Sequence, residues 1–269
     1  MRLFAASVMV MLFLVCCSES RKPSKQDTDD LDEELPAVTP VVEDLPKGAE
    51  VLFDDFMFNF ASDRSLQLRR IMFPLSITRS EHVEHVDTGQ WSMEPFFMDR
   101  GEYTLIFDTQ EQMELVNDTT VSMAVVEKIY LEADSVRQYL FNRQDGRWKL
   151  VEVRLQSVDD NVNASFLEFY RRFVTDSMFR QNSLCDEIAF SFADPEDDFG
   201  QMEGFITPDS WEAFAPSLPK DSIYNIVYGE QDANARQKIF IIRGIGNEQD
   251  MELTFLQEHG RWKLSKLTE

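Results

Sequence analysis

The chain has 269 residues, of which 43% are hydrophobic and 12% aromatic, enough for one large domain or two of ordinary size. Its 26 basic residues stand against 49 acidic ones, and the formal net charge of −23 excludes a nucleic-acid binder and a protein held on anionic lipid by charge alone. Three cysteines cannot form a disulfide scaffold, and three histidines leave little material for histidine-based catalysis or metal binding.

The N-terminus has the pattern of an export signal. An apolar run of 12 residues, Phe4 to Val15, is shorter than the roughly 20 residues that a membrane-spanning helix needs. It leads into Leu14-Val15-Cys16-Cys17, which resembles the lipobox of bacterial lipoproteins, where a cysteine is diacylated and becomes the first residue. Cys17 fits best because Leu14 lies three residues before it, while Cys16 and an ordinary cleaved signal peptide are the alternatives. We expect a signal peptide over residues 1–16, lipid attachment at Cys17 and export to the cell envelope, on the periplasmic or surface face of the outer membrane.

A polar linker follows this motif. Residues 18–50 contain ten acidic and four basic side chains, four of the ten prolines and no aromatic residue. The block Asp27–Glu34 reads DTDDLDEE, and its like charges repel one another. Such a segment cannot bury enough apolar surface to offset the entropy lost on ordering. We therefore expect residues 17–50 to form the lipidated cysteine and an acidic disordered spacer.

An internal repeat organises the rest of the chain. The pentapeptide GRWKL occurs at 146–150 and again at 260–264, a spacing of 114 residues. Upstream, Phe56-x3-Phe60-x2-Asp63 matches Phe169-x3-Phe173-x2-Asp176 at a spacing of 113. An ordered series of matches at both ends predicts two tandem domains, over residues 51–157 and 158–269.

Two further matches lie in the middle of each copy, at other spacings. Lys128-Ile129-Tyr130 matches Lys238-Ile239-Phe240, and Tyr103 aligns with Tyr224. The change of spacing indicates loop insertions and deletions, and the tyrosine match predicts one phenol in each domain.

Each copy also shows the same order of local signals. Aromatic residues recur on one helical face at 53–60 and at 166–173, and a second helical stretch follows each of them, at 64–72 and 177–185. Ser165 and Glu168 form a capping-box pattern at the start of the second copy. After about residues 100 and 222 the apolar period changes to two, which is typical of strands, and Asp145-Gly146 and His259-Gly260 mark tight turns. Helices first and an antiparallel meander afterwards predict an α+β fold.

A chain that begins with aromatic-rich helices and closes on a hairpin containing GRWKL resembles the nuclear-transport-factor-2-like (NTF2-like, SnoaL-like or cystatin-like) superfamily. The tandem arrangement behind a lipobox also looks like an uncharacterised Bacteroidetes lipoprotein family. The resemblance covers residues 50–269 and implies two cone-shaped domains, in each of which N-terminal helices pack on a curved antiparallel sheet around a conical pocket. It implies no reaction, because the superfamily includes isomerases, dehydratases, binding modules and scaffolds.

Six side chains are candidates for these pockets. Isomerase-like members of the superfamily use an aspartate base with a tyrosine or aspartate oxyanion partner, and the repeated carboxylates and phenols of this chain are Asp63, Asp176, Tyr103 and Tyr224. Each aspartate also suits the N-cap of the helix that follows it, and each tyrosine suits a half-buried strand. Trp148 and Trp262, from the repeated GRWKL, suit either a pocket wall or the packing of a sheet on a helix.

The sequence predicts no metal and no cofactor. His82 and His85 would share one face of a helix, but a zinc site needs a third ligand and the segment lacks the HExxH spacing. Cys185 aligns with Met72 of the first copy, which predicts an apolar core position and not a nucleophile. The chain contains no phosphate-binding glycine loop and no GxSxG motif.

Functions of different classes fit these features. The favoured hypothesis is a non-enzymatic envelope lipoprotein that binds a small molecule, a peptide or a partner protein, in an NTF2-like pocket or at the interface between the domains. The alternative is an isomerase- or hydrolase-type enzyme with one active and one degenerate domain, and a third hypothesis is a purely structural role. An open pocket with a desolvated Asp–Tyr pair would favour an enzyme, an open apolar pocket would favour binding, and a filled pocket would favour a scaffold.

Overall fold

A computed structural model describes residues 44–194, 197, 200–246 and 250–269. The expected signal peptide, Cys17 and most of the expected linker lie outside these residues. The chain from residue 43 onward forms one compact unit. In the part of the chain that the structure describes, no helix has both the length and the apolar character needed to cross a bilayer.

The helices and strands follow the same order twice, with η denoting a 3₁₀ helix. The first half contains η1 (Lys47–Glu50), α1 (Phe53–Ser62), α2 (Arg64–Arg70), β1 (Ile71–Arg79), β2 (His82–Val86), η2 (Thr88–Gln90), η3 (Phe96–Asp99), β3 (Glu102–Phe107), η4 (Gln110–Asn117), β4 (Met123–Tyr130), β5 (Ser135–Gln144) and β6 (Arg147–Ser157). The second half contains η5 (Val158–Asp160), α3 (Ala164–Thr175), α4 (Ser177–Asn182), β7 (Leu184–Ala193), β8 (Gln201–Ile206), η6 (Pro208–Ala213), β9 (Ser222–Tyr228), β10 (Gln237–Gly244), β11 (Asp250–Glu258) and β12 (Arg261–Thr268). Each half is a helix pair, a hairpin and four further strands, which confirms the α+β class.

The tight turns expected near the end of each half are confirmed. Asp145 and Gly146 join β5 to β6 with φ of 52° and 75°, and His259 and Gly260 join β11 to β12 with φ of 50° and 77°. Positive φ at both central residues is the geometry of a type I′ turn, whose twist suits the flanking strands.

The strand registers of these two hairpins also agree. Phe141 lies opposite Leu150, and Phe255 lies opposite Leu264, and in each hairpin a register shift directly precedes the phenylalanine. The repeated GRWKL therefore builds the same bulged hairpin twice.

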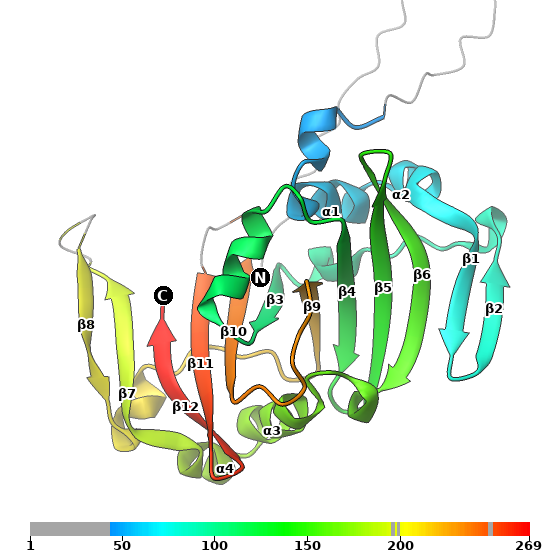
Figure 1. The fold of residues 1–269 in the computed structure, drawn as a ribbon. Coiled ribbons are helices and arrows are strands. Elements are labelled where there is room, and N and C mark those ends of the chain that lie inside the picture. Colours follow the sequence, from blue (N-terminus) through cyan, green and yellow to red (C-terminus); the bar gives the residue numbers. More distant parts are fainter. Residues whose placement is uncertain (1–43, 195–196, 198–199, 247–249) are drawn as a thin grey trace, which may run out of the picture. The chain divides into compact units, whose positions relative to one another are not determined.

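The twelve strands of the described residues form one sheet, in the order β2-β1-β6-β5-β4-β9-β3-β10-β11-β12-β7-β8 (Figure 1). A meander confined to each half would pair β3 with β4 and β9 with β10. Instead, β9 lies antiparallel to β4, and β3 lies antiparallel to β10. β3 and β9 run parallel and pair only at Thr104 and Asn225. The two halves have exchanged these strands, and the exchange joins the two expected sheets into one.

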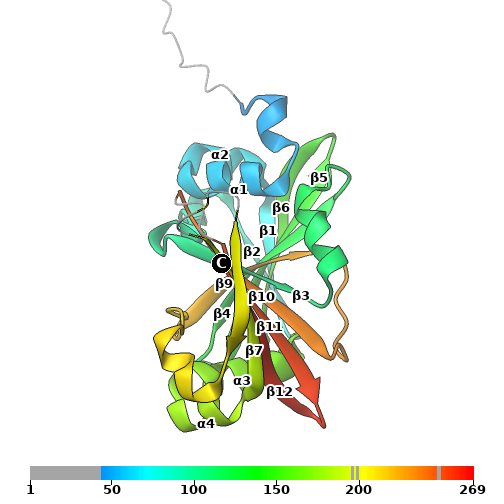
Figure 2. The ribbon, with the colours of Figure 1, turned by 90° about the vertical axis from the view of Figure 1, so that its left-hand side faces the viewer.

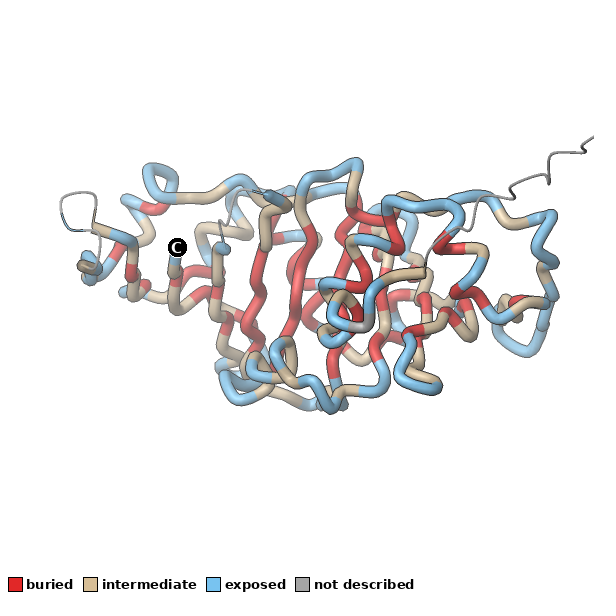
Figure 3. Tube along the Cα trace, turned by 90° about the horizontal axis from the view of Figure 1, so that it is seen from above, coloured by how far each residue is buried: buried red, intermediate tan, exposed pale blue. Residues whose placement is uncertain are grey.

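The two helix pairs cover opposite faces of this sheet. Neighbouring residues of a strand point to opposite faces, and on β3 Leu105 belongs to the core under α1, whereas Ile106 belongs to the core under α3. Figure 2 shows α1 and α2 on one side of the strands and α3 and α4 on the other. The central strands are therefore buried on both faces, as the continuous buried stretches in Figure 3 show.

The folded part begins before residue 51, where the sequence places the end of the linker. Arg70, buried at the end of α2, donates to Asp44 Oδ1 at 2.6 Å and to Glu50 Oε1 at 2.5 Å. A buried guanidinium needs anionic partners, and these two carboxylates supply them. The domain limits 51–157 and 158–269 stay a prediction, because the exchanged strands tie the two halves into one unit.

The first hairpin of each half differs from the sequence-based expectation. The expected helical stretches 64–72 and 177–185 end at Arg70 and Asn182, and strands β1 and β7 follow at once. The buried positions of β1 are Ile71 and Leu75, and those at the start of β7 are Leu184 and Ile188. A spacing of four is also the spacing of a helical face, so the apolar pattern of these half-exposed strands is the same as that of a helix.

Candidate functional site

The two repeated aspartates are N-caps on the surface. Asp63 Oδ1 accepts a hydrogen bond from the backbone N–H of Ser65 at 2.7 Å, and Asp176 Oδ1 accepts one from the N–H of Phe179 at 2.9 Å. Both aspartates are exposed, and neither lines any of the five cavities considered below. The helix-cap interpretation therefore accounts for their repetition.

The two repeated tryptophans pack on the first helix of each half. Trp148 meets Phe53 edge-on at a centroid distance of 4.9 Å, and Trp262 meets Phe166 edge-on at 5.7 Å. The Trp262 indole N–H donates to Ser165 Oγ at 3.2 Å. Ser165 therefore serves this indole and not the expected capping box, and α3 begins at Ala164 without a side-chain cap.

Aromatic side chains fill the interior under both helix pairs. Phe141 lies 5.3 to 6.0 Å from the rings of Phe53, Phe56 and Phe60. In the second half Phe255 contacts the rings of Phe166, Phe169 and Phe173 at 5.3 to 5.5 Å. These rings occupy the space where the resemblance implies a conical pocket in each half.

Tyr103 belongs to a carboxylate cluster that the sequence did not reveal. Its hydroxyl donates to Asp54 Oδ2 on α1 at 2.9 Å, and the hydroxyl of Tyr228 on β9 donates to Asp54 Oδ1. Arg243 Nη1 lies 3.6 Å from Asp54 Oδ2. Desolvation by burial raises the pKa of Asp54 despite these partners. Asp54 thus ties α1 to both exchanged strands.

This raised pKa predicts a pH dependence that Asp54→Asn removes. Because the folded state holds the Asp54 proton more tightly than the unfolded state, the free energy of unfolding falls as the pH rises from about 4 to the folded pKa, and is level above it. Asp54→Asn cannot titrate and still accepts a tyrosine hydrogen bond. Urea denaturation between pH 4 and 8 should show wild type losing stability relative to Asp54→Asn over that interval. Asp55→Asn, an exposed neighbour, is the control, and an equal pH profile for wild type and Asp54→Asn would contradict the assignment.

Tyr224 belongs to a second cluster of the same kind. Tyr139 donates to Glu94 Oε2 at 2.8 Å, and Tyr224 donates to Glu94 Oε1 at 3.4 Å. Lys128 Nζ lies 3.7 Å from Glu94 Oε1 and 5.0 Å from the centroid of the Tyr224 ring. Burial raises the pKa of Tyr224 to about 12, so this phenol stays protonated at neutral pH.

Both tyrosines lie in the core under α1, one from each half of the chain. The expectation of one equivalent phenol in each half is therefore wrong. Lys128 lies opposite Tyr224, and Ile242, which is 114 residues after Lys128, lies opposite Thr104. The repeat therefore aligns Tyr224 with Thr104 and not with Tyr103. The difference matters because side chains one residue apart on a strand point to opposite faces.

The match between Lys128 and Lys238 is corrected by the same registers. Phe141 lies opposite Ala124, whereas its counterpart Phe255 lies opposite Lys238. Lys238 therefore takes the place of Ala124. Both strands carry similar apolar residues, so a slip of four residues still matched two letters and a pair of aromatic residues.

A cationic row crosses the first half of the sheet on the face that α1 covers. Leu155 on β6 lies between Arg79 on β1 and Arg137 on β5, and Arg137 in turn lies opposite Lys128 on β4. We use the term cationic row for Arg79, Arg137 and Lys128. Like charges on directly opposed strand residues destabilise a sheet, and here they occur in a protein of net charge −23. Such a local conflict is typical of a functional position.

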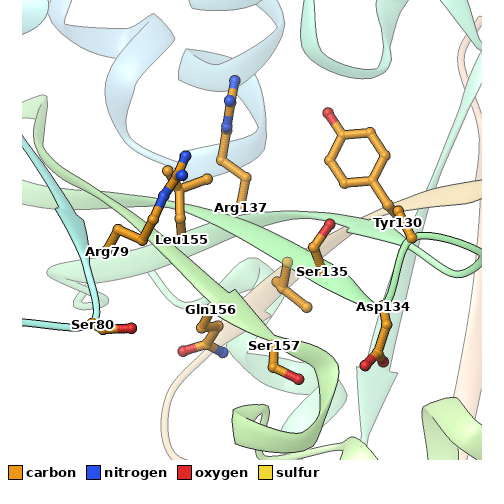
Figure 4. A pocket seen from close by; sticks show the side chains of 11 residues that line it. Arg79, Ser80, Tyr130, Asp134, Ser135, Arg137, Leu155, Gln156 and Ser157 are labelled. Carbon is orange, nitrogen blue, oxygen red and sulfur yellow. The ribbon is translucent and has the colours of Figure 1, made fainter.

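A cavity of about 600 Å³ opens at this row. Its lining includes Arg79, Arg137 and Tyr130, whose side chains extend to one side of the strands, whereas Asp134 and Ser157 extend to the other (Figure 4). Arg137 Nε is buried and has no hydrogen-bond partner among the described residues. The cavity thus offers two guanidinium groups and a phenol beside an apolar patch.

The other cavities offer less. One of about 640 Å³ is lined by Asp108 and by three glutamines, Gln112, Gln231 and Gln237. The side-chain amides of these glutamines already form hydrogen bonds within the chain. Three further cavities measure about 190 to 210 Å³. The cavity at the cationic row is therefore the candidate site.

The reactive-looking side chains outside it do not assemble a site. His82 and His85 lie on strand β2, where a separation of three residues directs them to opposite faces. Cys185 is only half-buried and its counterpart Met72 is exposed, so the expected core position is wrong; burial raises the pKa of the thiol, which makes it a weaker nucleophile at neutral pH. Among the described residues, no three His, Cys, Asp or Glu side chains are grouped as metal ligands.

Comparisons with known proteins agree with this architecture. A family model described as "Domain of unknown function (DUF4348)" matches residues 31–269. A crystal structure of an NTF2-like protein from Bacteroides fragilis is 38% identical in sequence, with a TM-score of 0.77, and the alignment covers 84% of this chain and 98% of that chain. No curated protein matches the chain.

Proposed function

The chain belongs to the DUF4348 family and has an NTF2-like fold, and from this premise we propose that it is a non-enzymatic binding protein for a small organic anion. The ligand carries a carboxylate or a phosphate on an apolar body. It binds in the cavity at the cationic row, not under the helices.

The observation that carries this proposal is the buried Nε of Arg137, which has no hydrogen-bond partner among the described residues. A buried polar atom without a partner costs free energy that an anionic ligand would recover. An arginine fork matches the two oxygens of a carboxylate or phosphate, and Arg79 lies on the other side of Leu155 to provide a second fork.

The apolar part of the ligand follows from the rest of the lining. Tyr130 and Leu155 flank the arginines, and the volume of about 600 Å³ lies within the range of small-molecule sites. The hydroxyl of Tyr130 extends to the same side as the guanidinium groups (Figure 4). An aromatic carboxylate or phosphate has the matching combination of charge and apolar surface.

The place of action is part of the same proposal. The lipobox-like segment ending at Cys17 and the acidic spacer support a protein tethered by lipid to the outer membrane of the cell envelope, with the binding unit reaching away from the bilayer. Two acyl chains provide stable anchoring, whereas one is marginal. The ligand would therefore be a metabolite or cell-wall fragment of the envelope.

The experiment titrates phenyl phosphate, benzoate and the uncharged benzamide into the full chain by calorimetry. We expect the two anions to bind and benzamide not to bind. Arg137→Gln should raise the dissociation constant for phenyl phosphate at least about tenfold, equivalent to about 1.4 kcal/mol. The variant loses both the repulsion from Lys128 and the interactions of Arg137 with Tyr139 and Glu94, and its melting temperature reports that it is still folded.

The matched control is Arg154→Gln, on strand β6 outside the cavity, where Arg154 pairs with Glu152 at 2.8 Å. It should leave the dissociation constant unchanged. Equal weakening by both variants would indicate a general charge effect and would contradict a site at the cationic row, as would equal binding of benzamide.

A second candidate function, proton-transfer catalysis, is favoured by the desolvated pairing of Asp54 with two tyrosines. Such a group is the expected base of an isomerase-type member of the superfamily. However, Asp54 already accepts both phenol hydrogen bonds and faces Arg243, and it lines none of the five cavities. A base needs access to substrate, so binding is the function that the geometry supports best.

A further inference from the structure

The outer edge of strand β8 is an open end of the sheet. In the strand order of the described residues β8 stands last, with β7 as its only neighbour. The strand at the other end, β2, carries His82 and Glu84, which approach each other to 3.5 Å. Polar and charged side chains discourage a further strand from pairing with an edge, and β8, with the sequence QMEGFI, has Glu203 as its one charged side chain.

A stack of three phenylalanines lies beside this edge. Phe190 and Phe192 on β7 have ring centroids 5.0 Å apart, and Phe214 after η6 lies 6.2 and 6.5 Å from them, with interplanar angles of 20° to 29°. Phe190 lies across Gly204, since a Cβ on that glycine would be 2.7 Å from the ring. The glycine therefore allows the ring to lie flat on the hairpin.

Apolar side chains around the stack are open to solvent. Met202, opposite Phe192, is 43% exposed, and Phe214 is 44% exposed. Phe205, on the other face of β8, is 67% exposed. Large apolar side chains that are exposed together at one edge of a sheet are typical of an interaction site.

The charge of this region specifies the chemistry of the partner. Residues 181–219 contain nine acidic side chains and no lysine, arginine or histidine. Glu203 lies on β8 itself, and Asp186 and Glu187 are exposed on β7. A second copy of this chain or an anionic lipid surface would bring like charges to the edge, whereas a cationic partner would find complementary charge.

We propose that β8 receives an extended, cationic segment of a partner polypeptide, which adds to the sheet as a further strand. The backbone of the segment pairs with the free edge of β8, and alternate lysine or arginine side chains lie over the Phe192–Phe214 stack. The intervening side chains of the segment are apolar, and they contact Phe205 on the other face of β8. This surface is separate from the cavity at the cationic row.

The test uses a labelled hexapeptide of alternating arginine and valine, titrated against the full chain by fluorescence anisotropy. We expect saturable binding that weakens as salt is raised. A hexapeptide of the same charge with every backbone nitrogen methylated cannot donate hydrogen bonds to a strand edge, and it should bind at least about tenfold more weakly. A glutamate–valine hexapeptide should not bind.

Two variants locate the site. The double variant Met202→Lys, Glu203→Lys should abolish binding of the arginine–valine peptide, whereas Glu84→Lys on β2 should leave its affinity unchanged. Equal affinity for the methylated peptide, equal loss in both variants, or a dimer of the chain that the double variant dissociates would overturn the proposal. Circular dichroism and the melting temperature of each variant report that the protein is still folded.

Discussion

Residues 44–157 and residues 158–269, produced as two separate polypeptides, are expected to stay unfolded alone and to fold when mixed. The reason is the exchange of β3 and β9. Without the second half, β4 loses the strand beside it, and β3 loses its partner β10. The core under α1 also loses Tyr224, Ile226 and Tyr228, all of which come from β9.

The isolated first half cannot repair this loss by folding β3 back onto β4. By the repeat, Thr104 on β3 corresponds to Tyr224, and Asp108, directly after β3, corresponds to Tyr228. In the place of β9 they would put a carboxylate and a small hydroxyl into an aromatic core, and Tyr103, Leu105 and Phe107 would turn outward.

The folding and assembly of the fragments can be measured by circular dichroism and analytical ultracentrifugation, on each fragment alone and on their equimolar mixture. We expect native-like spectra and a 1:1 complex only in the mixture. A stable, monomeric first half with a cooperative thermal transition would contradict the exchange. A chain cut at the same place after folding should remain a complex, which controls for damage by the cut itself.

Lys238→Met is expected to lower the free energy of unfolding by about 3–5 kcal/mol, because it leaves a buried carboxylate without its cation. Lys238 Nζ lies 2.5 Å from Asp108 Oδ1 and 2.6 Å from Asn163 Oδ1, and the exposed fractions of the Lys238 and Asp108 side chains are 3% and 6%. The lysine thus links β10 to β3 and to the start of α3.

The double variant Asp108→Asn, Lys238→Met should recover most of this loss. The asparagine can still accept the hydrogen bond that the Asp232 N–H donates at 2.7 Å, and no unpaired charge remains. Urea denaturation of the two single variants and the double variant gives the coupling energy, with Lys266→Met on β12 as a less buried control. Additive losses in the double variant would show that the ion pair is not coupled.

The parts of the fold that depend on neighbours in sequence could be predicted from it. The aromatic helices, the type I′ turns and the repeated GRWKL hairpin each have their determinants within about ten residues. The positions of Asp63 and Asp176, each directly before a second helical stretch, likewise predict helix N-caps. These features recur at a constant spacing because each is local.

The parts that depend on pairing between distant segments could not be predicted. EYTLIF and SIYNIVY both predict buried strands, but their preference for exchange between the halves becomes visible only against the core that each strand enters. Asp54 acquires Tyr228, and Glu94 acquires Tyr224, only because β9 crosses to the first half. The cationic row is similarly invisible, since Arg79 and Arg137 become neighbours only across β6.

The most direct test of the proposed binding site is a methyl NMR titration of the full chain with phenyl phosphate. Leu155 lines the cavity and lies opposite Arg137, on the face of the cationic row, whereas Leu66 and Leu75 lie in the core under α1 and α2. The proposal predicts saturable shifts of the Leu155 methyl signals that Arg137→Gln abolishes, with Leu66 and Leu75 unchanged. Shifts confined to Leu66 and Leu75 would place the ligand under the helices and contradict binding at the cationic row.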